Sequence, residues 1–198
     1  AYVPHASGNI YARDDSDTVR VAENILAQLD AAQVALLFPN GMAAIAAVFR
    51  ALPTGATVLL QAQIYWGTTK WVREFCSRRG MVLVEADLSK PENMDKLCAS
   101  HEPDLVFIET PSNPWLRSTD IAHAANKVHD VGGRLVVDAT AATPILTRVL
   151  DFGADIVMHS ATKGLNGHSD VLAGVLATNT PESPHWQAIL TDRHDAGA

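Results

Sequence analysis

The sequence contains few of the features that mark specialised classes of protein. Of its 198 residues, only two are cysteine and 6% are aromatic. No apolar run approaches the roughly 20 residues that a membrane-spanning helix needs, and the N-terminus lacks the basic and then apolar pattern of a signal peptide. The chain also has no low-complexity stretch and no internal repeat. We therefore expect a cytoplasmic globular protein that neither spans nor binds a membrane.

The two cysteines, Cys76 and Cys98, are 22 positions apart, and neither belongs to a C-x-x-C pair. This spacing suits neither a disulfide-stabilised domain nor a structural zinc site. Both side chains are expected to be buried thiols.

Basic residues are a minority among the charged residues. Fifteen Lys and Arg residues stand against 22 Asp and Glu residues, which gives a formal net charge of -7. A chain without a basic stripe does not release counterions from a phosphate backbone, so nucleic acid is not an expected partner. The fingerprints G-x-G-x-x-G and G-x-x-x-x-G-K-[ST] are also absent, which counts against a nucleotide cofactor.

Short apolar runs alternate with segments whose apolar residues recur every three or four positions. This alternation predicts an α/β fold, a single doubly wound domain with a mainly parallel sheet. The seven expected strands are Val34–Phe38, Thr57–Gln61, Met81–Glu85, Leu105–Glu109, Arg134–Asp138, Asp155–His159 and Val171–Ala177. The expected helices are Thr18–Leu29, Gly41–Leu52, Trp66–Arg78, Glu92–Ala99 and Thr119–Val131, with a further helical pattern from Pro184. Residues 139–144 are expected to form a loop.

In an open parallel sheet the ligand lies beyond the carboxyl ends of the strands, so the residues that follow each strand matter most. After the first strand, Gly41 and Met42 open an Ala-rich helix whose free N–H groups suit an anion. After the sixth strand, Ser160 and Thr162 contribute hydroxyl groups and Lys163 contributes an amine. A lysine is most often a solvated surface residue, but this position beside two hydroxyls favours a functional role.

Two further strand ends have two interpretations each. Tyr65, after the second strand, either places an aromatic ring at the rim of the crevice or, with Trp66, covers the end of the sheet. Asp138, at the end of the fifth strand, either binds a cation or caps a helix. Burying an unpaired carboxylate costs several kcal/mol, so Asp138 must meet a cation or several hydrogen-bond donors.

An anion pocket, an acid, an amine and a flat aromatic ring match pyridoxal 5′-phosphate better than any other cofactor. This coenzyme needs a lysine for a Schiff base and an acidic partner for its pyridine nitrogen. The expected contacts are Lys163 for the Schiff base, Asp138 for the pyridine nitrogen, Tyr65 for the ring, and Gly41, Met42, Ser160 and Thr162 for the phosphate.

Five segments form a set of motifs in a fixed order. They are YAR at 11–13, NGMAA at 40–44, ETPSNP at 109–114, DIVMHSATK at 155–163 and LNGHSDV at 165–171. Together they closely resemble the signature of the Cys/Met-metabolism pyridoxal-phosphate enzymes, which include cystathionine γ-synthase, cystathionine lyases and methionine γ-lyase. The resemblance extends from about Gly8 to Ala177 and implies the large domain of fold-type I pyridoxal-phosphate enzymes.

The resemblance implies roles for three more residues. Asn113 would approach the phenolic oxygen of the cofactor ring. Tyr11 and Arg13 would reach the phosphate bound by a neighbouring subunit, and an arginine fork suits a phosphate because it can bind two oxygens. The active site would then exist only in a homo-oligomer, a homotetramer built from two dimers that share active sites. Lys163 and Tyr65 would be the catalytic residues.

The implied function is elimination or replacement at the β or γ carbon of a small sulfur-containing or activated homoserine amino acid, as in transsulfuration and in cysteine and methionine metabolism. Where relatives commonly have Tyr-Gly-Gly-Thr, and methionine γ-lyases have Tyr-Gly-Cys-Thr, this chain has YWGT at 65–68. The missing cysteine counts against a methionine γ-lyase. Asp138-Ala139-Thr140 likewise replaces the frequent Asp-Asn-Thr.

Family members are about twice as long as this chain, and their smaller C-terminal domain holds the substrate carboxylate. We therefore expect residues 1–198 to be a fragment, namely the cofactor-binding large domain with part of the N-terminal arm. One alternative is a non-catalytic remnant that binds the cofactor without turnover. The least favoured alternative is a metal hydrolase built on His159, His168, Asp138 and Asp170, because the two histidines are nine positions apart across a loop.

Overall fold

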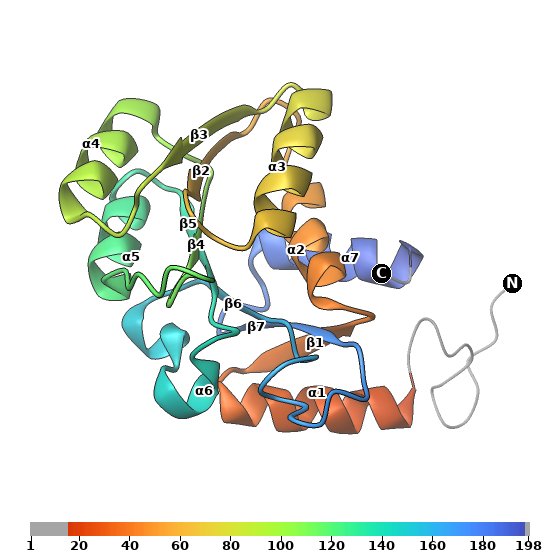
Figure 1. The fold of residues 1–198 in the computed structure, drawn as a ribbon. Helices are drawn as coiled ribbons and strands as arrows, with labels where there is room; N and C mark the ends of the chain where they lie inside the picture. Colours follow the sequence, from red (N-terminus) through yellow and green to blue (C-terminus); the bar gives the residue numbers. More distant parts are fainter. Residues whose placement is uncertain (1–15, 197–198) are drawn as a thin grey trace, which may run out of the picture.

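The computed structural model describes residues 16–196. Within them, seven strands form one sheet in the order β1-β7-β6-β5-β4-β2-β3 (Figure 1). The strands are β1 (Val34–Phe38), β2 (Thr57–Gln61), β3 (Val82–Ala86), β4 (Leu105–Glu109), β5 (Arg134–Asp138), β6 (Ile156–His159) and β7 (Gly174–Thr178). The helices are α1 (Asp17–Leu29), α2 (Gly41–Arg50), α3 (Trp66–Arg79), α4 (Pro91–His101), α5 (Ile121–Asp130), α6 (Thr143–Leu146), the 3-10 helix η1 (Val149–Phe152) and α7 (Pro184–Ala196).

The mainly parallel α/β sheet predicted from the sequence is confirmed. Strands β2 to β6 pair in parallel, whereas β7 is antiparallel to both β1 and β6. The parallel strands therefore end at one common edge of the sheet, and the residues that follow them can meet there.

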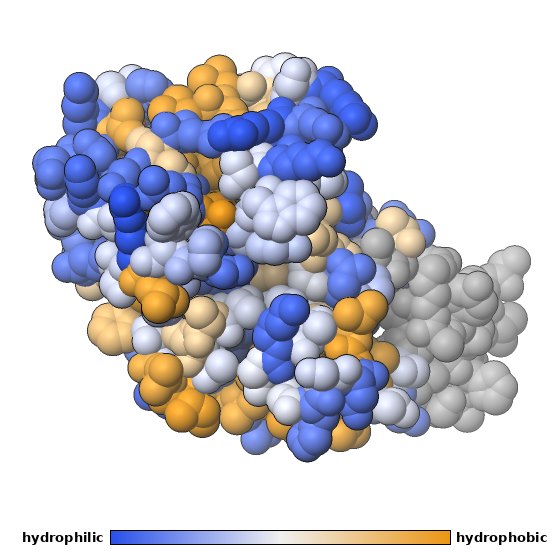
Figure 2. Space-filling view, in the orientation of Figure 1, coloured by the Kyte–Doolittle hydropathy of each residue, from blue (hydrophilic) through white to orange (hydrophobic). Residues whose placement is uncertain are grey.

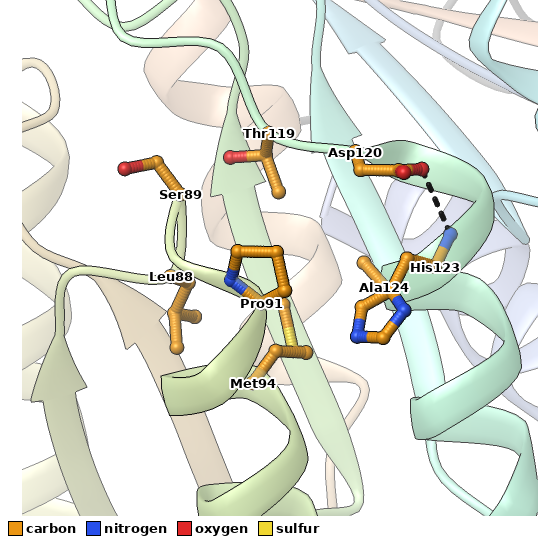
Figure 3. A pocket seen from close by; sticks show the side chains of 8 residues that line it. All are labelled: Leu88, Ser89, Pro91, Met94, Thr119, Asp120, His123 and Ala124. Atoms are coloured by element: carbon orange, nitrogen blue, oxygen red, sulfur yellow. Dashed lines mark hydrogen bonds between the residues drawn. The ribbon is translucent and has the colours of Figure 1, made fainter.

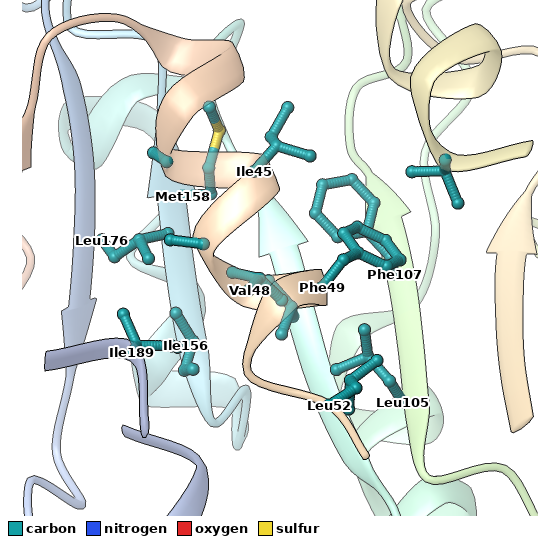
Figure 4. Close-up of a cluster of buried hydrophobic side chains, with 14 of the residues drawn as sticks. Ile45, Val48, Phe49, Leu52, Leu105, Phe107, Ile156, Met158, Leu176 and Ile189 are labelled. Carbon is teal, nitrogen blue, oxygen red and sulfur yellow. The ribbon is translucent and has the colours of Figure 1, made fainter. Parts of the chain in front are cut away.

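Helices cover both faces of the sheet (Figure 1). On one face α2, α3 and α7 bury a cluster that includes Phe49, Phe107 and Met158 (Figure 4). On the other face α1, α4, α5 and η1 bury a second cluster that includes Leu59, Val137 and Val157. Because neighbouring residues of a strand point to opposite faces, both clusters draw on the same continuous apolar runs.

Polar side chains cap the starts of α1, α2 and α5. The Asn40 side chain accepts a hydrogen bond from the Ala43 N–H (2.8 Å) and starts α2. Asp120 accepts one from the His123 N–H (3.0 Å) and starts α5. The Asn40 cap brings the first turn of α2 directly after β1, at the edge where the parallel strands end.

Two local predictions are wrong. The seventh strand begins at Gly174 rather than Val171, and Val171 and Leu172 are 51% and 70% exposed. The reason is that the Thr162 hydroxyl accepts a hydrogen bond from the Ala173 N–H and donates one to the Ala173 carbonyl (3.1 Å each). These polar groups of Ala173 therefore pair with a side chain and not with a neighbouring strand. Residues 139–144 are not entirely loop either, because Thr143 begins the short helix α6.

Both cysteines are free and buried, as predicted. Burial raises the pKa of the Cys76 thiol and of the Cys98 thiol to about 11, so both are protonated at neutral pH. No helix within residues 16–196 is long and apolar enough to cross a membrane.

Candidate active site

A pocket of about 630 Å³ opens at the carboxyl ends of the parallel strands. The face shown in Figure 2 mixes hydrophilic and hydrophobic residues and is hollowed near its centre. Eight of the predicted site residues line the pocket, namely Gly41, Met42, Tyr65, Asn113, Asp138, Ser160, Thr162 and Lys163. The two others, Tyr11 and Arg13, lie outside the described residues.

The pocket also contains residues to which sequence reasoning assigned no role. Among them are Ile45, Glu109, Thr140, Thr143, Met158 and Leu172. Glu109 and Thr140 had a visible signal, because one ends a strand and the other follows a strand at the ligand edge of the sheet. Ile45 and Met158 come from helix and strand faces that a sequence pattern marks only as core, whereas Leu172 lies in the loop before β7.

A second hollow lies between α4 and α5 and includes Pro91, Met94 and His123 (Figure 3). It measures about 10 Å³, which is room for about one water molecule. The His123 ring in this hollow contacts the Asp95 carboxylate on α4 (2.7 Å). This hollow is a helix packing contact and too small for a ligand.

One end of the large pocket is shaped by the approach of α2 to the residue after β6. A Cβ atom on Gly41 would lie 2.8 Å from the Cβ and 2.9 Å from the Oγ of Ser160. Only glycine fits at this position without a shift. The first-turn N–H groups of Gly41 and Met42 have no acceptor inside the helix, so this end of the pocket can bind an anion.

Asp138 lies in the pocket floor and is 6% exposed. Its Oδ1 accepts hydrogen bonds from the Thr140 N–H (2.9 Å) and the Thr140 hydroxyl (2.6 Å). Desolvation raises the pKa of Asp138, while the Thr140 hydrogen bonds and the charge of His159 act in the opposite direction. No Lys or Arg of residues 16–196 forms an ion pair with this carboxyl. The helix-cap interpretation is wrong, because the hydrogen bonds close a local turn and Asp138 caps none of the described helices.

Tyr65 lies at the pocket entrance and is 37% exposed. Its ring lies over Gly67 in the first turn of α3, since a Cβ on Gly67 would be 2.5 Å from the Tyr65 Cε1. The Trp66 ring lies beside it, with centroids 5.8 Å apart and planes tilted by 55°. Glycine at position 67 therefore makes room for the Tyr65 ring to lie at the pocket.

Lys163 lines the pocket from the turn that follows β6. Its backbone N–H donates to the Ser160 carbonyl (3.0 Å), and its carbonyl accepts from the Gly167 N–H (2.8 Å). These turn bonds fix the Lys163 backbone while its side chain stays exposed. Among the residues described, its amine forms no ion pair, which leaves it available to a ligand.

The four residues of the metal-hydrolase alternative do not converge. The His159 ring contacts the Asp30 carboxylate at the end of α1 (3.0 Å), and both side chains are buried. His168 binds the Asn166 carbonyl (2.7 Å), and Asp170 accepts from the Asn166 amide (2.8 Å). Within residues 16–196, no group of three His, Cys, Asp or Glu side chains could hold a metal ion.

The residues of the pocket fit pyridoxal phosphate. The free N–H groups at Gly41 and Met42 suit the phosphate, and Lys163 lines the same pocket. Asp138 is a buried carboxyl that no described cation neutralises, so it matches a protonated pyridine nitrogen. Fold and pocket together define a doubly wound α/β domain with a ligand pocket at the carboxyl ends of its parallel strands.

Comparison with known proteins identifies the family. Residues 3–197 match the Cys/Met metabolism PLP-dependent enzyme family, so the chain belongs to it. This confirms the family expected from the five motifs and its dependence on pyridoxal 5′-phosphate. The individual roles of the pocket residues stay predictions.

Curated relatives include lyases from plants and amoebae. The chloroplastic cystathionine β-lyase of Arabidopsis thaliana is 38% identical over 169 residues, which are 84% of this chain and 36% of that protein. The cystathionine γ-lyase of Dictyostelium discoideum is 38% identical over 172 residues, which are 87% of this chain and 44% of that protein. The chain spans less than half the length of these relatives.

Solved structures share the same fold. Cystathionine γ-synthase from Xanthomonas oryzae pv. oryzae, in complex with cystathionine, superposes with a TM-score of 0.89 at 35% identity, over 94% of this chain and 48% of that chain. A methionine γ-lyase from Micromonospora echinospora superposes with a TM-score of 0.88 at 35% identity, over 94% of this chain and 50% of that chain.

Proposed function

We propose that this chain is the cofactor-binding part of a pyridoxal-phosphate enzyme of the transsulfuration type. The reaction is elimination or replacement at the β or γ carbon of a sulfur-containing or activated homoserine amino acid. One observation carries the proposal: the Lys163 amine and the Asp138 carboxyl, which come from the ends of neighbouring strands, line one pocket. The relatives named above are lyases and synthases of this chemistry.

The two ends of the pocket would hold the cofactor through different chemistry. The N–H groups of Gly41 and Met42, with the hydroxyl groups of Ser160 and Thr162, would bind the phosphate. The Asp138 carboxylate would bind the pyridine N–H, and its burial strengthens the attraction of opposite charges.

The face and edge of the cofactor ring would be held by two loop residues. Tyr65 would stack on the ring, and Asn113 would approach its phenolic oxygen. Both residues line the pocket, and they come from the loops that follow β2 and β4.

Bound pyridoxal phosphate would supply an electron sink for negative charge at the substrate Cα. The Lys163 amine would remove the Cα proton as general base, and for γ chemistry it would also take a proton from Cβ. The Tyr65 phenol, at the exposed entrance, would donate a proton to the departing thiol or hydroxyl group. The buried apolar side chains of Ile45 and Met158 in the pocket wall would limit the access of water to this transfer.

Borohydride reduction of the chain mixed with pyridoxal phosphate tests the attachment site. We expect a reduced cofactor label on Lys163 alone, and a Lys163→Ala variant that carries no label. Lys127→Ala is the matched control, because Lys127 lies on α5 and does not line the pocket, and this variant should be labelled normally. Label on another lysine in the unchanged protein would overturn the site assignment.

The non-catalytic remnant differs from this proposal in a measurable way. Both bind the cofactor at Lys163, but only the enzyme releases a 2-oxo acid and a thiol from a thioether amino acid. We expect release by the parent protein at full length. Label on Lys163 with no product from that protein, either from a thioether amino acid or from an activated homoserine supplied with a thiol, would establish the remnant instead.

We also propose that the site is shared between two copies of the chain. The support is the resemblance of the YAR motif at 11–13, which assigns Tyr11 and Arg13 to the phosphate bound by a neighbouring subunit. Mixing Arg13→Ala with Lys163→Ala protein tests this directly, because one of the two sites in a mixed dimer retains both residues. Tight cofactor binding should return on mixing, and no recovery would refute the shared site. The homotetramer and the cytoplasmic location stay predictions.

A further inference from the structure

The two residues proposed to contact the cofactor ring lie on separate loops. Tyr65 lies between β2 and α3, and Asn113 lies between β4 and α5. Neither belongs to a strand, so no sheet hydrogen bond sets the distance between them. Their relative position at the pocket depends on contacts between the loops.

One carboxyl group bridges these loops. Glu109, the last residue of β4, accepts hydrogen bonds at Oε2 from the Tyr65 N–H (2.9 Å) and at Oε1 from the Asn113 N–H (2.5 Å). Each carboxylate oxygen therefore serves one loop. The Glu109 backbone is itself fixed, since all of β4 is buried and its N–H donates to the Gln61 side chain (3.2 Å).

We propose that Glu109 is a positioning residue, which sets Tyr65 and Asn113 at the cofactor ring by holding both loop backbones with one ionised carboxyl. The ring contacts in this inference rest on the proposed function, whereas the bridge itself exists without the cofactor. An ionised carboxyl suits the task because it only accepts hydrogen bonds and offers two oxygens to two donors. If Glu109 were protonated or replaced by glutamine, its side chain would present a hydrogen-bond donor to one of the two N–H groups, and that hydrogen bond would be lost.

The ionisation of Glu109, on which the bridge depends, responds to nearby charges. The side chain is 4% exposed, and desolvation together with the Asp138 charge on β5 raises its pKa to about 7. The two loop N–H groups act in the opposite direction. The other ionisable groups at the pocket are the Tyr65 phenol on the α3 side and the Lys163 amine after β6. A cation bound against Asp138 would weaken the repulsion and favour the ionised bridge.

Titration of the unchanged, cofactor-free chain tests the bridge without any substitution. Amide NMR signals of Tyr65 and Asn113 should move with one common midpoint, which should equal that of the Glu109 carboxyl carbon. The Thr57 N–H is the internal control, because it donates to a carboxylate other than Glu109, that of Asp104 (2.8 Å), and should not report the Glu109 midpoint. Separate midpoints for Tyr65 and Asn113 would overturn the proposal.

The Glu109→Gln variant tests the consequence for the cofactor. Its amide exchange at Tyr65, Asn113 or both should accelerate about tenfold or more, the loss expected for a hydrogen bond to a charged acceptor. Its dissociation constant for pyridoxal phosphate, measured by absorbance, should rise by a similar factor. Asp104→Asn is the matched control, since it replaces another carboxylate that binds a backbone N–H but does not line the pocket.

The outcomes separate this inference from the proposed function. Faster exchange with unchanged cofactor affinity would refute the positioning role and keep the bridge. Unchanged exchange at both amides would refute the bridge. Failure of the unchanged protein to bind pyridoxal phosphate at Lys163 would refute the proposed function, while the common titration midpoint would still establish the bridge.

Discussion

Glu109 and Asp138 occupy paired positions at the ends of β4 and β5, and both carboxyl groups are buried in the pocket floor. Desolvation raises the pKa of each group, and the Asp138 charge further raises that of Glu109. Two like charges in this environment disfavour each other's ionisation. The pocket is therefore electrostatically suited to a ligand that brings a positive charge.

Replacement of Asp138 should affect binding and stability in different ways. We expect Asp138→Asn to weaken pyridoxal-phosphate binding by about tenfold to hundredfold, because a buried opposite charge is lost. The cofactor-free variant should be at least as stable as the unchanged protein, because a desolvated carboxyl is removed while the Thr140 hydroxyl keeps an acceptor. Absorbance titration and urea unfolding measure the two effects. Equal affinity in the variant would refute the role of Asp138.

Gly41→Ala should block the end of the pocket at which we propose that the phosphate binds. The added Cβ would lie 2.8 Å from the Ser160 Cβ, so we expect a stability loss of about 1–3 kcal/mol from overpacking. Affinity for pyridoxal phosphate should fall about tenfold or more. Gly80→Ala is the control, because its φ of +61° strains the backbone by about 1 kcal/mol in open space away from the pocket. Equal affinities of the two variants would contradict the phosphate assignment.

The raised pKa of Glu109 predicts a pH dependence of stability for the cofactor-free chain. Its pKa rises from 4.5 to about 7 on folding, so the folded state binds more protons than the unfolded state between these values. The contribution is therefore favourable at low pH and is lost as the pH rises from about 4.5 to 7. It amounts to about 3 kcal/mol. The unfolding free energy of Glu109→Gln should therefore rise with pH relative to that of the unchanged protein, and equal slopes in the two proteins would contradict the raised pKa.

His185 predicts a pH dependence of the opposite sign. This side chain at the start of α7 is 5% exposed, and desolvation and the Arg134 charge lower its pKa from 6.5 to about 4. The unfolded state therefore binds more protons between these values, and stability rises by about 3 kcal/mol as the pH rises from about 4 to 6.5. His185→Gln should lack this contribution and lose stability as the pH rises through this range, whereas the exposed His101→Gln should follow the unchanged protein. A pH dependence of His185→Gln equal to that of the unchanged protein would contradict burial of the neutral ring.

These two effects oppose each other in one pH range. Above about 4.5, the stability that the unchanged protein gains through His185 offsets what it loses through Glu109. The unchanged protein should therefore show a weak net pH dependence up to about 6.5. The two single variants should show opposite slopes, and bound pyridoxal phosphate should reduce the Glu109 contribution by adding a cation beside Asp138.

Local patterns were sufficient to predict much of the fold. The bounds of β1, β2, β4 and β5 are those expected, because each strand is a short apolar run that ends at polar or turn residues. The helix expected at Thr119–Val131 is also found to within two residues, as α5, and Asp120 caps its start. The start of β7 was missed, because the apolar Val171 and Leu172 resemble strand while the Thr162 hydroxyl holds the adjacent backbone.

The candidate site was predictable as far as it follows from the ends of parallel strands. Asp138 and Lys163 were found because each comes directly at or after a strand end. Glu109 occupies an equivalent position, but its contacts join two loops through folding, and no local pattern shows such a bridge. The pairing of His159 with Asp30 was missed as well, because it joins strand β6 to the end of α1 across 129 positions.

The sequence by itself determined the alternating elements, the edge at which polar residues gather and the family to which the chain belongs. These properties follow from hydrophobic periodicity and from short motifs, which need no knowledge of distant contacts. The tertiary structure alone decided which carboxyls are desolvated, how closely Gly41 lets α2 approach Ser160 and which loops one carboxyl connects. Burial and hydrogen bonding depend on residues brought together from separate strands, and this proximity sets the pKa values and the geometry of the pocket.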